Sequence, residues 1–321
     1  MNRPFPVSAT LTAVAIGYSN PSAGMIHRGV LPPVPVTSER FTWLTYPIDQ
    51  AFTVPELQVG RKGRVNEVEF SAKPQEGTVK HYGLDDVIPI TDIDEAKKAR
   101  ERKVSKYDPE GAATEGLSRL IELGREVRAA RIVQKPENYD KERRIALVGE
   151  AKFSNFEKSD PFEVLNAAMT KPLVYRANTI SMGQEVWEVI KRHPRLIKAV
   201  KGGMTSDGAI SREQFAELME IDPARFYVGI SMENAAAKGQ PVNLVKVWGN
   251  SIQLSYVDTS KASPEDNILT WGFTAEYETR IAGSLPAPEV GLKGGIRIRV
   301  GEMVEEVVCA KSLGFIIRDA V

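Results

Sequence analysis

The sequence has little of what a metal site, a disulfide framework or a redox centre would need. Its 321 residues include one cysteine, Cys309, and only three histidines, His27, His81 and His193. A single cysteine excludes an intrachain disulfide. The histidines are far apart and have no cysteine or histidine neighbours at ligand spacing, which argues against a metal site. We therefore expect no bound metal and no other cofactor.

The chain also lacks an excess of charge of either sign and a long apolar run. Its 42 basic and 42 acidic side chains cancel, which argues against a dedicated nucleic-acid-binding module but leaves local patches open. No stretch of 18 apolar residues occurs, and Pro4 and Pro6 interrupt the opening segment, so neither a membrane-spanning helix nor a signal peptide is expected. The prediction is a protein without a membrane partner, made in the cytosol.

Complete active-site motifs are missing as well. The segment from Gly229 to Glu233 begins like a nucleophile elbow but ends in glutamate where G-x-S-x-G requires glycine. The loop from Gly202 to Gly208 is rich in glycine but lacks the Gly-Lys-Ser/Thr end of a phosphate loop. Asp85 and Asp86 are paired carboxylates, and solvated turn residues are their simplest interpretation. We expect no enzyme, and we keep an α+β hydrolase using Asp85 or Asp86 as a remote alternative.

Proline dominates the first 60 residues. The prolines that divide short apolar pieces there are Pro21, Pro32, Pro33, Pro35, Pro47 and Pro55. Proline fixes its own φ and biases the preceding residue toward extended geometry. The segment is therefore predicted to be an extended arm, and such an arm needs a surface of its own chain or of a neighbour to lie on.

A β-hairpin with a charged tip follows between residues 46 and 82. Gly60 and Gly63 supply the turn. Arg61 and Lys62 lie between these two glycines and Arg64 follows them, so the tip carries three cations. Apolar and polar residues alternate with a period of two along the returning strand, at Val68, Phe70 and Ala72 among glutamates, serine and lysine. An edge hairpin folded onto its own domain and a hairpin that meets another subunit both remain open.

The clearest helix begins at Asp108-Pro109, an N-cap followed by proline in the first turn, and extends to about Gln134. Its apolar positions are Leu117, Leu120, Ile121, Gly124 and Val127, and its predicted outer side carries Ser118, Glu122, Arg125 and Glu126. Arg128 and Arg131 fall within the apolar arc. Their side chains either extend beyond the apolar arc to reach solvent near the end of the helix, or form ion pairs with another subunit.

The second half of the chain alternates helices and strands. We expect helices at 161–169 and 184–191, a strand at 179–182, and a capping box formed by Ser211 and Gln214. Further strands are expected at 244–248, 252–256, 268–280 and 296–300. This order predicts a compact α/β unit, and no internal repeat is present.

The order of these elements, together with several segments, resembles the major capsid proteins of tailed bacteriophages with the Hong Kong 97-type fold, in the group of siphophages and Mu-like transposable phages. The segments that carry the resemblance are Leu11–Pro21, Val30–Val36, Val79–Asp86, Gly124–Ala130, Ser159–Phe162 and Gly314–Val321. The resemblance covers essentially the whole chain, and the combination is more specific than any one segment.

The resemblance implies an α+β fold divided into four parts. Residues 1–44 would be the N-terminal arm and 45–90 the hairpin known as the E-loop. Residues 91–155 would form the peripheral domain with a spine helix at about 108–134, completed by strands at about 271–300. Residues 156–270 would form the axial domain, completed by 301–321.

The resemblance also implies a structural function. Copies of the chain would assemble in the host cytoplasm into hexamers and pentamers of an icosahedral head, the virion capsid, which encloses double-stranded DNA contacted without sequence specificity. A separate scaffolding protein and a portal protein are implied partners, and a decoration protein is a further candidate. Arg61, Lys62, Arg64, Arg128 and Arg131 are the predicted intersubunit contacts.

Two departures and one alternative accompany the resemblance. The long helical scaffolding segment that opens many relatives is not found before the arm, so we expect no cleavage there. The isopeptide cross-link of some relatives would need a hairpin lysine, Lys62 or Lys73, but its partner asparagine and catalytic carboxylate are not identifiable. An encapsulin-type compartment shell is the alternative within the same fold, distinguished by enzyme cargo in place of DNA and portal.

Overall fold

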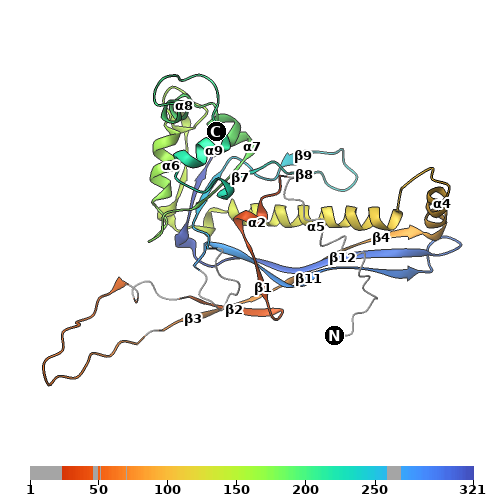
Figure 1. The fold of residues 1–321 in the computed structure, drawn as a ribbon, viewed down its shortest axis with the longest axis horizontal. Coiled ribbons are helices and arrows are strands. Elements are labelled where there is room, and N and C mark those ends of the chain that lie inside the picture. Colours follow the sequence, from red (N-terminus) through yellow and green to blue (C-terminus); the bar gives the residue numbers. More distant parts are fainter. Residues whose placement is uncertain (1–23, 46–49, 51, 70, 259–268) are drawn as a thin grey trace.

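The computed structural model describes residues 24–45, 50, 52–69, 71–258 and 269–321. The chain forms an elongated molecule with a helical unit near one end of a long sheet (Figure 1). The predicted features at Leu11–Pro21 and Phe70 lie outside the described residues.

A four-stranded sheet runs along the molecule in the order β1-β11-β12-β4. Its strands are β1 (Pro33–Val36), β11 (Gly272–Ala287), β12 (Gly295–Val308) and β4 (Lys80–Pro89). β12 pairs in antiparallel register with both β11 and β4, and β1 joins β11 in parallel. The arm is therefore partly anchored as an edge strand, and Pro33 and Pro35 have no backbone N–H to offer another strand.

One long helix, α5 (Pro109–Val133), packs on this sheet, and it confirms the helix predicted from Asp108 to about Gln134. Leu117 and Ile121 pack against Ile298 and Val300 of the sheet. The predicted outer side is wrong, however. Leu120 is exposed, whereas Ser118, Glu122, Arg125 and Glu126 are buried, because other segments bring partners for their charges.

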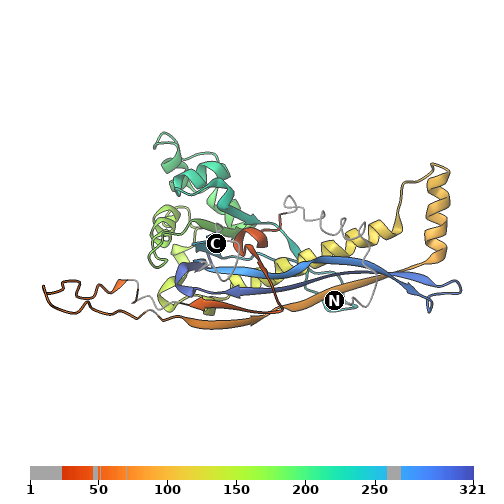
Figure 2. The ribbon, with the colours of Figure 1, turned by 60° about the horizontal axis from the view of Figure 1, so that its bottom comes forward.

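Two further elements project from this framework (Figure 2). Helix α4 (Ile90–Glu101) stands at one end of the sheet, on the side that carries α5, and buries no residue. The mixed charges of α4 follow no apolar period, so the sequence does not predict this helix. At the opposite end, β2 (Arg40–Thr45) and β3 (Lys73–Thr78) pair in antiparallel register. The predicted strand alternation around residue 68 is wrong, because ladder pairing begins only at Lys73.

The second unit is a five-stranded sheet in the order β5-β13-β10-β6-β7 with helices around it. Its strands are β5 (Arg144–Ala146), β13 (Gly314–Arg318), β10 (Ile252–Ser255), β6 (Thr179–Gly183) and β7 (Phe226–Gly229). Its helices are α6 (Pro161–Met169), α7 (Gln184–Ile190), α8 (Pro194–Val200) and α9 (Arg212–Leu218). The predicted helices, the strand at 179–182 and the Ser211–Gln214 capping box are confirmed.

The remaining elements are short. A single helical turn, α2 (His27–Val30), lies in the arm and was not predicted. The hairpin of β8 (Met232–Asn234) and β9 (Leu244–Lys246) stands beside α5 (Figure 1). Short 3-10 turns occur at Pro136–Asn138, Lys141–Arg143, Gly149–Ala151, Pro223–Arg225 and Lys311–Leu313.

Each unit has its own core. The largest apolar cluster lies in the helical unit around Phe153, Trp187 and Phe215. A second cluster joins the arm, α5 and Trp271, and smaller ones lie along the long sheet. β12 continues unbroken to Val308, so the predicted boundary at residue 300 falls inside a strand. Among the described residues no helix is long and apolar enough to cross a membrane.

Candidate assembly surfaces and their junction

The hairpin exposes the three cations that the sequence analysis singled out. Gly63 donates its backbone N–H to the carbonyl of Gly60, at 2.8 Å, and this turn places Arg61, Lys62 and Arg64 at the tip. All three are exposed, and within the described part of the chain none of their side chains forms an ion pair or hydrogen bond. We call these three residues the hairpin tip.

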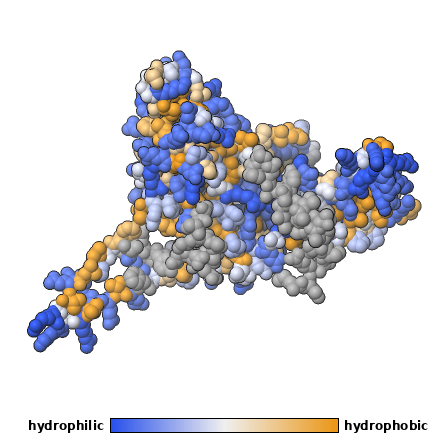
Figure 3. Space-filling model, viewed as in Figure 1, coloured by the Kyte–Doolittle hydropathy of each residue, from blue (hydrophilic) through white to orange (hydrophobic). Residues whose placement is uncertain are grey.

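The legs of the hairpin have no protein surface beneath them. Every described residue from 52 to 69 is exposed. The apolar side chains among them are Phe52, Val54, Leu57, Val59, Val65 and Val68. In the space-filling view these legs protrude from the molecule, with apolar colour along them and hydrophilic colour at the tip (Figure 3). Such a segment gains hydrophobic stabilisation only by lying on another surface.

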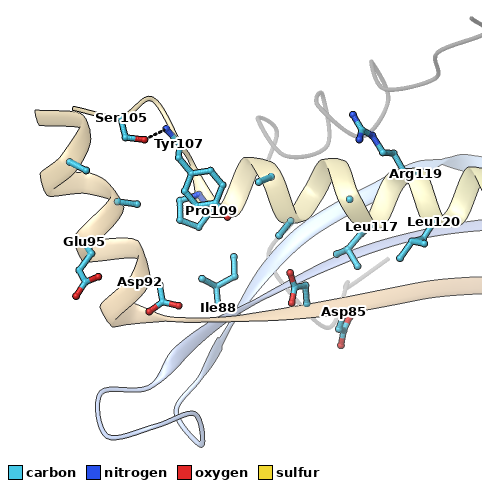
Figure 4. Close-up of a pocket in the computed structure, with 16 residues that line it drawn as sticks. Asp85, Ile88, Asp92, Glu95, Ser105, Tyr107, Pro109, Leu117, Arg119 and Leu120 are labelled. Carbon is cyan, nitrogen blue, oxygen red and sulfur yellow. Dashed lines mark hydrogen bonds between the residues drawn. The ribbon is translucent and has the colours of Figure 1, made fainter. Parts of the chain in front are cut away.

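A groove of about 1140 Å³ lies at the other end of the molecule, between β4, α4 and α5 (Figure 4). Apolar side chains form much of its lining, including Ile88, Ala96, Tyr107, Leu117 and Leu120. Asp86, Asp92 and Glu95 add three exposed carboxylates. Arg119 is the one cation among the described residues of the lining, and it is paired with Glu115 four residues earlier. The groove is thus apolar inside and acidic at its border.

The two carboxylates Asp85 and Asp86 have different surroundings. Asp85 also lines the groove, but its carboxylate accepts two hydrogen bonds of 2.7 Å from Arg299, with Arg297 at 3.6 Å. The hydrogen bonds of Arg299 lower the pKa of Asp85. Asp85 is therefore held as a carboxylate in an ion pair. Among the described residues that line the groove there is no histidine, cysteine or lysine beside Asp86.

One buried carboxylate joins the arm, the long helix and the second unit. Glu126 is fully buried. It accepts hydrogen bonds from the backbone N–H groups of Ile26 and His27 at 2.9 and 2.8 Å, from Ser231 Oγ at 3.2 Å and from Trp248 Nε1 at 2.6 Å. A buried charge is tolerated only when paired and hydrogen-bonded, and this one has donors from three separate segments. Glu126 therefore fixes the arm against α5.

His27 lies between two carboxylates in the same junction. Its Nδ1 is 2.9 Å from Glu126 and its Nε2 is 3.2 Å from Glu122. Burial on its own would lower the pKa of His27, but the hydrogen bonds with Glu122 and Glu126 outweigh it and raise that pKa. Burial likewise opposes ionisation of Glu122, yet His27 and Arg280 hold its pKa well below the usual range.

Arginines extend this junction into the sheet. Arg280 lies 2.7 Å from both Glu122 and Glu302. Arg125, which is 2% exposed, pairs with Glu276. Helical periodicity does not reveal that these helix residues are buried, because their partners lie outside the helix, as with Arg125 and Glu276, which are 151 positions apart along the chain. The only local signal is that these helix residues are charged, and charged helix residues are predicted to face solvent.

Arg128 and Arg131, predicted to contact other subunits, both have partners within the chain. Arg128 is 3.0 Å from Glu306 and lies 3.6 Å above the ring of Tyr82. Arg131 is mostly exposed and 3.4 Å from Glu233. A contact of either arginine with another subunit stays a prediction, and it would compete with these carboxylates.

Comparison with known proteins places these features in context. A scan against protein-family models found no match. The chain is 37% identical over 320 residues to the major capsid protein of Pseudomonas phage JBD67, covering 100% of this chain and 99% of the relative. It is 24% identical over 270 residues to the major capsid protein of Burkholderia phage BcepMu, covering 81% of this chain and 79% of the relative.

Solved structures share the fold. A phage-related protein from Bordetella bronchiseptica RB50 superposes with a TM-score of 0.72 at 19% identity, over 99% of this chain and 98% of that chain. The capsid of a native GTA particle superposes with a TM-score of 0.57 at 11% identity, over 100% of this chain and 95% of that chain.

Proposed function

Because this chain belongs to the major capsid proteins of tailed bacteriophages, with the Hong Kong 97-type fold and a capsid-forming function, we propose that its subunits join end to end, the hairpin of one lying in the groove of the next. The observation that carries this proposal is that two surfaces of complementary chemistry lie at opposite ends of one molecule (Figure 1). The basic tip with apolar legs matches the apolar groove with its acidic border.

The position of the two surfaces determines the type of assembly. A hairpin cannot reach a groove at the far end of its own subunit, so the contact joins two molecules. Two different patches in contact form a heterologous interface, which closes into rings when the rotation between subunits allows it. Rings of six and five subunits are what a closed icosahedral shell requires, and we propose that this interface builds them.

The finer parts of the function belong to the same proposal. We assign the chain a structural, nonenzymatic role in a head that encloses double-stranded DNA, assembled in the host cytoplasm with a separate scaffolding protein and joined to a portal protein. The division into arm, E-loop, peripheral domain and axial domain fits the two sheets. It does so best if β12 is assigned to the peripheral domain up to Val308 and β13 to the axial domain.

Charge reversal with rescue tests the proposed contact. Arg61→Glu with Arg64→Glu places carboxylates opposite the acidic groove, and we expect the yield of closed shells, counted by electron microscopy after co-expression with neighbouring phage genes, to fall at least about tenfold. Adding Asp86→Lys and Glu95→Lys to the same chain restores opposite charges and should recover most of that yield.

The control is Lys238→Glu, which reverses an exposed cation in the loop between β8 and β9, outside both surfaces. Its shell yield should equal that of the unmodified protein. The proposed contact would be contradicted if Arg61→Glu/Arg64→Glu formed shells at normal yield. It would also be contradicted if the variant with all four substitutions did not recover the shell yield.

A further inference from the structure

A dense group of cations lies where α4 ends. Residues 97–106 contain six basic side chains and one acidic one, in a chain whose net charge is zero. Arg100 pairs with Asp108 at 3.0 Å. The other five, which we call the basic cluster, are exposed, and none of their side chains forms an ion pair or hydrogen bond with a described residue: Lys97, Lys98, Arg102, Lys103 and Lys106.

The basic cluster is a surface separate from the groove. The α4 residues that line the groove, Asp92, Glu95, Ala96 and Ala99, recur at helical spacing on one side. Lys97 and Lys98 fall on the other side of the same helix. Because α4 stands off the sheet, its basic end is the part farthest from the sheet at this end of the molecule (Figure 2).

Lysine occupies a backbone position that favours glycine. Lys103 has φ +57°, and the bonds from Lys103 N to Arg100 O and from Val104 N to Ala99 O, at 2.9 and 3.0 Å, end α4 in a Schellman motif. The left-handed residue of this motif is usually glycine, because a Cβ is disfavoured there. A cation at this position therefore costs some local stability, which points to a use for the charge.

The composition of the basic cluster indicates its partner. Four of its five members are lysine, a residue depleted in protein–protein interfaces, and Val104 is the one large apolar side chain exposed among residues 97–106. A phosphate backbone needs neither an apolar anchor nor a directional partner, because released counterions supply most of its affinity for lysine and arginine.

We infer that the basic cluster binds the phosphate backbone of double-stranded DNA, without sequence preference. This inference rests on the proposed function, because a head that encloses double-stranded DNA makes that DNA the natural ligand. It adds where the subunit meets the DNA, namely at the free end of α4, while the groove on the other side of the same helix holds a neighbouring subunit.

The test measures DNA binding by the full-length protein. A mixed-sequence duplex of about 100 base pairs is titrated at several salt concentrations between about 50 and 200 mM. The variant Lys97→Gln/Lys98→Gln/Lys103→Gln should bind at least about tenfold more weakly, and the slope of log K against log salt should become smaller by about 2 to 3. The matched control, Lys135→Gln/Lys198→Gln/Lys238→Gln, removes three exposed cations outside the basic cluster, the hairpin tip and the groove, and should bind DNA within about twofold of the unmodified protein.

A single substitution separates binding from folding. Lys103→Gly removes one cation and relieves the left-handed backbone, so the thermal midpoint should not fall, while DNA affinity should drop severalfold with a slope smaller by about 1. Unchanged DNA binding in both cluster variants would overturn the inference. So would equal losses in the cluster variant and in the matched control.

The outcomes also distinguish this inference from the proposed function. Loss of shells by the cluster variant with normal DNA affinity would assign the basic cluster to an acidic protein partner and overturn the inference. If the unmodified protein forms no shells while the cluster variant loses DNA affinity, the proposed assembly fails and the DNA surface stands.

Discussion

At the scale of single residues, Glu126 has the largest predicted effect on stability. Replacing it by glutamine keeps the shape but removes the charge and one acceptor oxygen, so donors from Ile26, Ser231 or Trp248 lose their partner in a fully buried site. We expect Glu126→Gln to lower the free energy of unfolding by about 2 to 4 kcal/mol, measured by urea denaturation of the unassembled protein.

The matched control is Glu115→Gln on the exposed side of the same helix, where the carboxylate pairs only with Arg119. That change should cost no more than about 0.5 kcal/mol. Equal effects of the two substitutions would mean that the junction contributes no more to stability than a surface ion pair.

His193 predicts a pH dependence of opposite sign to that of His27. It is fully buried, its Nδ1 accepts the backbone N–H of Arg195 at 3.3 Å, and its Nε2 lies 3.0 Å from Ser159 Oγ. Burial lowers the pKa of His193 to about 4. The unfolded chain therefore takes up this proton first, and stability falls as the pH drops from about 6.5 toward 4.

The substitution His193→Asn keeps an acceptor at the start of α8 and removes the titration. We expect the unmodified protein to lose about 1 to 2 kcal/mol more than the variant between pH 7 and pH 5, from urea unfolding at each pH. His27 is common to both proteins, so its raised pKa does not affect the comparison. Identical losses would show that His193 does not carry this dependence.

At the scale of elements, the hairpin should be dispensable for folding and required for assembly. All its described residues from 52 to 69 are exposed, so they bury almost nothing against their own subunit. Replacing residues 53–69 by a four-residue Gly-Ser linker should leave the thermal midpoint within about 2 °C and abolish shells. On the same preparation, calorimetry measures the thermal midpoint and electron microscopy counts shells. A large fall in the midpoint would show that the hairpin folds back onto its own subunit.

The elements also show how far the sequence predicts the structure. The helix α5 was predicted almost to the residue, because Asp108, Pro109 and an apolar period are local signals. Its buried side was assigned incorrectly, because Glu122, Arg125 and Glu126 are compensated by residues far away in the sequence. α4 was missed since a helix that buries nothing has no apolar period. The hairpin tip was predicted from its turn glycines, whereas the groove depends on three elements meeting in space.

At the scale of the whole molecule, two different surfaces at opposite ends explain how a chain of zero net charge can associate repeatedly with copies of itself. A net charge of zero avoids large repulsion between subunits, while local separation of charge gives the contact its direction. The junction at Glu126 ties the arm, the long helix and the second unit together through buried hydrogen bonds.

The direction of the contact leads to a prediction about mixtures. The hairpin variant Arg61→Glu/Arg64→Glu has an intact groove, and the groove variant Asp86→Lys/Glu95→Lys has an intact hairpin. Neither should assemble alone at neutral pH. Mixed in equal amounts, they should form rings of six in which the two variants alternate, because the intact basic hairpin fits the intact acidic groove and the acidic reversed hairpin fits the basic reversed groove. A ring of five cannot alternate without one mismatched contact, so the mixture should form rings but few closed shells. Analytical ultracentrifugation would detect rings in the mixture, monomers for each variant alone, and rings or shells for the unmodified protein. If the mixture stayed monomeric while the four-residue exchange assembled, the hairpin and the groove could not be the two halves of one contact. Alternating rings agree with a single directional interface whose repetition around a closed ring makes the capsid stable.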